Sequence, residues 1–255
     1  MTLRPATIYA DAWAAWRRDW TVLTAVAGMF VFLPQLALLL LVPDVPDIAT
    51  VTGTDPTDPT MQAYVAAFQT WVASYGLLYL GVVVTALYGQ FALVAVYLTP
   101  GSATVGGALG SALRLLPRLL LASAVWMLPL GLIGVILARV PFLILPLFAL
   151  IMARTLLIGP AILAARPIGA VAAIGRSVVL TRGHMLVLAS VILTIVLAQF
   201  LLSTPLVALD QWMAKNAPNP IARLIVDALA AGVAALSSTV MALVQVAVWR
   251  RLVRV

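Results

Sequence analysis

The chain has 255 residues, of which 64% are hydrophobic and only 9% are charged, and its formal net charge is +7. A soluble domain is typically about 45–50% apolar and about 25% charged, so this composition excludes an ordinary soluble core and indicates a membrane protein. The arginines adjoin apolar segments instead of forming a basic tract with aromatic platforms, so no nucleic-acid binding is predicted.

Six apolar segments are long enough to cross a membrane as helices, which requires about 20 residues for a hydrocarbon core of about 30 Å. We therefore predict an all-α polytopic bundle in a single domain, 1–255, with up to three interfacial amphipathic helices. The predicted spans are about 21–42, 72–98, 119–138, 141–165, 185–206 and 224–249. Only Arg139 and its neighbourhood separate the third span from the fourth, so these two are expected to form a tight hairpin.

Basic residues gather at alternate ends of the six segments. One side has Arg4, Arg17, Arg18, Arg114, Arg118, Arg166, Arg176, Arg182, Arg250, Arg251 and Arg254, and the other has Arg139, Lys215 and Arg223. The positive-inside rule then places both termini in the cytoplasm. A five-span alternative would break this alternation. The first span is expected to remain uncleaved, because it is too long for a signal peptide and lacks a small-residue cleavage site.

Three segments before the inside-to-outside spans resemble one another. The stretches 7–20, 104–118 and 168–182 combine small and apolar residues at helical spacing with arginines, which is typical of amphipathic helices lying in the headgroup plane. We expect Arg18, Arg118, Arg176 and Arg182 to contact anionic lipid headgroups on the cytoplasmic side. The alternative is that these are ordinary basic loops, without a repeated structural unit.

Two loops are expected on the outer side, Pro43–Thr60 and Ser203–Pro220, the second with a short helix around Val207–Ala217. The first contains four aspartates whose spacing does not match a calcium-binding EF-hand loop, so a solvated acidic loop is the preferred interpretation.

Arg154 is the most informative single residue, because it lies about 12 residues from either end of its predicted span. A side chain cannot reach the membrane surface from there, and such a charge normally faces the bundle interior, a cavity or a partner. One hypothesis is an anion or lipid-phosphate site in a cavity, with Gln90 and Gln199 facing it. The other is helix–helix packing through glutamine amides and backbone carbonyls. Asp227 has Arg223 four residues before it as a local partner.

Catalytic chemistry is not predicted. The chain has no cysteine, no glutamate and a single histidine, His184, so no metal site and no cofactor are expected. A catalytic triad would need His184 beside Ser177 or Ser190 and an aspartate on the same side. A helix end at Gly183, with His184 at the interface, is the preferred interpretation.

The segment 173–184 resembles a motif of the bacterial membrane-domain family named after glycerophosphoryl diester phosphodiesterases. The matching residues are Arg176, Ser177, Leu180, Thr181, Arg182 and Gly183, and Arg154 and Pro160 fit the preceding span. The resemblance implies a six-helix membrane domain of the bacterial inner membrane. In some relatives this domain is joined to a soluble phosphodiesterase that needs metal-binding glutamates, aspartates and histidines, which this chain lacks.

The sequence thus predicts a non-enzymatic integral membrane protein that associates with membrane lipids or with partner membrane proteins. The alternative is a small transporter or permease with a midplane polar site around Arg154. An enzyme acting on lipids comes third, because no nucleophile–base pair is visible.

Overall fold

The structure is a computed structural model that describes residues 3–46, 51, 58–99, 104–137, 141–165, 168–216 and 219–253. All regular structure in these ranges is helical, and six helical segments are long and apolar enough to cross a membrane. The chain is therefore an all-α multi-pass membrane protein, as the apolar segments predict. Its elements are α1 (Pro5–Ala27), the π-helix η1 (Gly28–Phe32), α2 (Leu33–Leu41), α3 (Pro59–Leu98), α4 (Val105–Leu137), α5 (Pro141–Thr155), α6 (Ile158–Ala164), α7 (Ala170–Leu180), α8 (Met185–Asn216) and α9 (Pro220–Val253).

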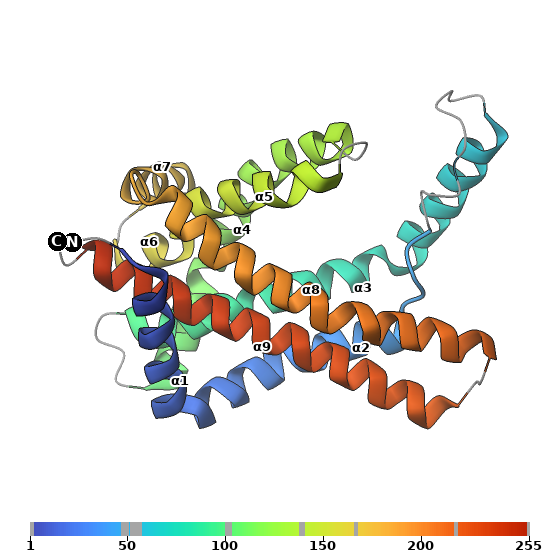
Figure 1. Cartoon of the computed structure of the whole chain (residues 1–255), viewed down its shortest axis with the longest axis horizontal. Coiled ribbons are helices and arrows are strands. Elements are labelled where there is room, and N and C mark those ends of the chain that lie inside the picture. The colour runs from blue at the N-terminus through green and yellow to red at the C-terminus, as the bar shows by residue number, and fades with distance from the viewer. Residues whose placement is uncertain are drawn as a thin grey trace.

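The first helix contains a kink that separates two parts with different roles. Asp19 leaves helical geometry, with φ −118° and ψ 22°. Before the kink, α1 runs across the end of the bundle, and after it the chain turns and continues through η1 and α2 along the bundle (Figure 1). The kink lies between the interfacial helix expected at 7–20 and the span expected at 21–42.

The last helix, α9, is the centre of the bundle. It contacts α8 and α1 most extensively and also packs against α2, α3, η1 and α6. Its buried residues include Ala231, Ala235 and the stretch 241–244. The two chain ends lie side by side at one end of the bundle (Figure 1), as an even number of crossings requires.

The predicted fourth span, 141–165, is not one continuous helix. The chain leaves helical geometry at Leu156–Leu157, so α5 ends at Thr155 and α6 starts at Ile158. The cause is Pro160, which has no N–H. In a continuous helix its ring would clash with the carbonyl of Leu156, four residues earlier. The short α6 is deeply buried and packs against α3, α4 and α7.

No helix boundary lies between the interfacial helix expected at 104–118 and the span expected at 119–138. One continuous helix, α4, covers both from Val105 to Leu137. Pro117 removes a single backbone hydrogen bond, and the leucines around it are strong helix formers.

Two helices reach further than the predicted spans at the opposite end of the bundle. The helix α8 continues from 206 to Asn216, so the short helix expected around Val207–Ala217 is the end of α8. The loop expected from Ser203 is wrong up to Asn216, and Pro205 lies inside the helix. The helix α3 has 40 residues, about 60 Å at about 1.5 Å per residue, and its first part projects away from the other helices (Figure 1). The Asp58 side chain caps α3 by accepting from the Thr60 N–H, and the hydrogen bonds from Thr60 lower the pKa of the Asp58 carboxyl.

Candidate functional site

The arginines that the sequence assigns to lipid contact lie at the bundle end that carries both termini, which we call the basic end. Two of them also connect helices. Arg118 donates from Nη1 to the Ile168 carbonyl over 3.2 Å, which joins α4 to the start of α7. The Arg176 guanidinium lies 5.8 Å from the centroid of the Trp249 ring and joins α7 to α9. Both residues therefore have a packing role in addition to the predicted surface role.

Other arginines at the basic end point into solvent or lipid. The side chains of Arg17, Arg114 and Arg182 are exposed, and none of them forms a hydrogen bond or ion pair with the residues that the structure describes. Arg18 is 64% exposed and pairs with its neighbour Asp19 over 2.9 Å. The basic end thus offers several guanidinium groups to an anionic surface.

The crosswise half of α1 has one buried and one exposed face. Ile8 and Ala12 are buried, and the Tyr9 hydroxyl donates to the Val191 carbonyl of α8 over 3.2 Å. Trp13 in this half is 58% exposed, and Trp20, which directly follows the Asp19 kink, is 57% exposed. Tryptophan rings at a helix surface favour the headgroup region, so this geometry agrees with an interfacial helix.

A polar cluster holds the kink of α1. The Asp19 carboxylate accepts hydrogen bonds from Arg18, at 2.9 and 3.0 Å, and from the Tyr97 hydroxyl of α3, at 2.9 Å. Arg250 of α9 lies 5.6 Å from the centroid of the Tyr97 ring and donates to the Tyr97 carbonyl over 3.3 Å. The cluster joins α1, α3 and α9 at the kink, directly before the first predicted span, 21–42.

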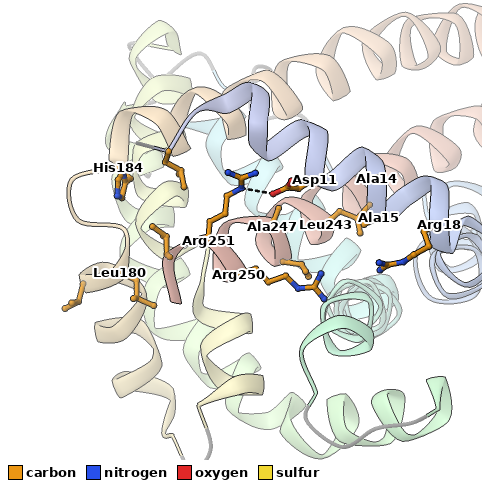
Figure 2. A pocket seen from close by; sticks show the side chains of 14 residues that line it. Asp11, Ala14, Ala15, Arg18, Leu180, His184, Leu243, Ala247, Arg250 and Arg251 are labelled. Atoms are coloured by element: carbon orange, nitrogen blue, oxygen red, sulfur yellow. Dashed lines mark hydrogen bonds and ion pairs between the residues drawn. The ribbon is translucent and has the colours of Figure 1, made fainter. Parts of the chain in front are cut away.

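Next to this cluster lies a groove of about 1060 Å³ between α1, the end of α7 and the last turns of α9, which we call the basic groove. Its polar lining contains Arg18, Arg250, Arg251, Asp11 and His184 (Figure 2). Arg251 pairs with Asp11 over 2.6 Å. The apolar lining includes Ala14, Ala15, Leu180, Leu243, Val246 and Ala247.

The residue pattern does not predict this groove, because it shows Arg250 and Arg251 only as basic residues after the last span. One signal points toward it. Asp11 precedes the first span, on the side that the positive-inside rule gives to the arginines after the last span.

Arg154 lies in the last turn of α5, near the middle of the apolar segment Pro146–Ala164, but this segment is not one continuous helix because α5 ends at Thr155. Its guanidinium donates to the Val178 carbonyl of α7 and to the Met185 sulfur of α8, both over 3.2 Å. This matches the packing hypothesis in its use of a backbone carbonyl, but no glutamine amide takes part.

The side chain of Ser177, in the segment 173–184 that resembles the family motif, hydrogen-bonds to both sides of this helix break. The fully buried Ser177 hydroxyl donates to the Arg154 carbonyl over 2.7 Å and accepts from the Leu157 N–H over 3.1 Å. Thr181, also fully buried, donates to the Ser177 carbonyl over 2.9 Å. The helix α7 ends at Leu180, three residues before the end predicted at Gly183, and a turn through Gly183, whose φ is +85°, leads to His184. Ser177 is thus committed to the backbone and forms no hydrogen bond with His184.

The structure brings Gln90 and Gln199 together but leaves Arg154 out. Both glutamines line a cavity of about 480 Å³ between α3, α5, α8 and α9, which we call the polar cavity. Three hydroxyl groups, of Ser203, Ser237 and Ser238, also line it, and the rest of the lining is mainly apolar. The predicted site around Arg154 is therefore two separate places.

At the opposite end of the bundle, Arg223 does not pair with Asp227. It forms a two-pronged ion pair with Asp210 of α8, at 2.7 and 3.1 Å. This partner exists because α8 extends past its predicted end. Asp227 is 8% exposed.

Within the described ranges, no group of three or more histidine, cysteine, aspartate or glutamate side chains could hold a metal ion. Comparison with family models, curated proteins and solved structures gives no match for this chain.

Proposed function

We propose that this chain is a non-enzymatic integral protein of the bacterial inner membrane, with its basic end in the cytoplasmic leaflet, where it binds anionic lipids. The observation that carries the proposal is the gathering of arginines at that end. Arg17, Arg114 and Arg182 are exposed and have no partner among the described residues. A basic residue near an anionic membrane surface contributes about 1 kcal/mol to the attraction.

The crosswise half of α1 supports the same placement. Its exposed Trp13, like Trp20 just after the kink, suits the headgroup region, and its buried face holds it against the ends of α8 and α9. In this arrangement the helix lies in the membrane surface and brings its arginines to the level of the lipid phosphates.

The test is the lipid preference of the variant R17Q/R114Q/R182Q. The protein is reconstituted with spin-labelled phosphatidylglycerol or phosphatidylcholine, and the motionally restricted fraction of each lipid is measured. We expect the wild type to prefer phosphatidylglycerol, with a preference that falls as salt rises. The triple variant should lose most of it, and K215Q, which removes one charge at the opposite end, should keep it. An unchanged preference in the triple variant would contradict the proposal.

A second candidate function, transport of a small polar solute, rests on the polar cavity. Gln90, Gln199 and three serine hydroxyls lining one intramembrane cavity are the type of groups that a polar solute would need. The chain has no cysteine, so S238C can be probed without background. Transport requires water in the cavity and predicts reaction of S238C with a water-soluble thiosulfonate. An unreactive S238C in folded protein would exclude this function.

A further inference from the structure

The basic groove combines a positively charged side and an apolar side within one cavity. Its volume of about 1060 Å³ lies at the upper limit of about 300–1,000 Å³ that is usual for ligand sites. It lies at the basic end, between the crosswise half of α1 and the last turns of α9.

The charged side has more cations than anions. Three arginines line the groove, and against them stand Asp11, which pairs with Arg251, and the adjacent Asp19, which pairs with Arg18. The local net charge is therefore +1 with His184 neutral. Arg18 and Arg250 reach toward one another from opposite helices (Figure 2). Among the described residues, Arg250 donates only to the Tyr97 carbonyl, so most of its five N–H groups remain available.

The apolar side consists of small and aliphatic side chains. Leu243, Val246 and Ala247 of α9 are only 3–5% exposed and form its floor, whereas Ala14 of α1 and Val179 of α7 are exposed. A soluble phosphate would use only the charged side of this groove. An amphiphile with one negative group and a hydrocarbon chain would use both sides.

We propose that the basic groove binds one anionic phospholipid of the inner leaflet. The phosphate lies between the Arg18 and Arg250 guanidinium groups, because arginine forms paired, charge-assisted hydrogen bonds with phosphate oxygens. The acyl chains lie along Ala14 and Val179, the apolar residues of the lining that remain exposed. The inference rests on the proposed function, because it places the basic end in the inner leaflet, and it adds a single defined site to the general lipid preference.

Native mass spectrometry of the purified full chain in detergent, titrated with phosphatidylglycerol, tests the site. The wild type is expected to retain one phosphatidylglycerol, and R18Q/R250Q is expected to weaken this binding about tenfold or more. The variant K215Q removes a charge far from the groove and should bind like the wild type. The variant A14W keeps every charge but fills the groove from an exposed position, and it should also weaken binding. If R18Q/R250Q does not fold, the binding of phosphatidylglycerol by A14W tests the site instead.

Three results would overturn the inference. The first is wild-type binding by R18Q/R250Q or, where only A14W folds, by A14W. The second is an equal loss of the retained lipid in R17Q/R114Q/R182Q, which would indicate a diffuse surface field and would leave the proposed function intact. The third is displacement of the lipid by glycerol phosphate at equal concentration, which would identify a soluble ligand.

Discussion

Ser177 closes the break between α5 and α6 with one hydroxyl group. It donates to the Arg154 carbonyl and accepts from the Leu157 N–H, so it satisfies two backbone groups that the break separates. Buried backbone groups without partners cost free energy, and the cost is high in a membrane, where water is absent.

The variant S177A should therefore lower the free energy of unfolding by about 1–3 kcal/mol, because both backbone groups lose their partner. Thermal unfolding in detergent measures this as a lower midpoint. The matched control is S190A, since Ser190 is exposed and donates only to the Val187 carbonyl of its own helix. It should change stability by less than about 0.5 kcal/mol. Equal midpoints for the two variants would show that the Ser177 bonds are not important.

At the scale of elements, a close contact between α3 and η1 depends on a glycine. A methyl group on Gly89 would lie 2.7 Å from the Phe30 Cβ and 3.0 Å from the Val31 Cγ2. The Tyr88 ring packs edge-on against Phe30 at 5.0 Å between centroids. Glycine therefore allows α3 to approach the π-helix of the first span, as small residues do at many membrane helix interfaces.

We expect G89A to destabilise the protein by about 1–3 kcal/mol, because the α3–η1 contact must open. The control G81A has no atom within 4 Å of the added methyl group. It should be neutral or slightly stabilising, since alanine is the better helix former. Both are measured by thermal unfolding in the same detergent, and a G89A midpoint at or above that of G81A would exclude a close contact here.

The predicted boundary between the first two segments lies close to a feature of the structure. The helix expected at 7–20, which contains Arg17 and Arg18, and the apolar segment expected from 21 meet near the Asp19 kink. The break before Pro160 could have been located more closely, because a proline disturbs the carbonyl four residues earlier. The predicted span 185–206 and the short helix expected around Val207–Ala217 form one continuous helix to Asn216, and the Asp210–Arg223 ion pair joins this part of α8 to α9.

The whole molecule shows a separation of charge between its two ends. The arginines that the sequence places on one side of the membrane lie together at the basic end. There, the Asp11–Arg251 ion pair joins the first helix to the last. The basic groove forms only when α1, α7 and α9 meet, and neither their packing nor the crosswise direction of α1 follows from the spacing of residues. Helix packing, which the spacing of residues does not give, also places Gln90 and Gln199 in one cavity and Arg154 outside it.

The proposed binding of cytoplasmic anionic lipids requires that the basic end faces the cytoplasm. The chain has no cysteine, so R17C, R182C and K215C each provide one reactive thiol at an exposed position. In intact spheroplasts, we predict that a membrane-impermeant maleimide labels K215C but labels R17C and R182C only after permeabilisation. Labelling of R17C and R182C from outside, with K215C protected, would contradict the orientation and with it the proposed binding of cytoplasmic anionic lipids.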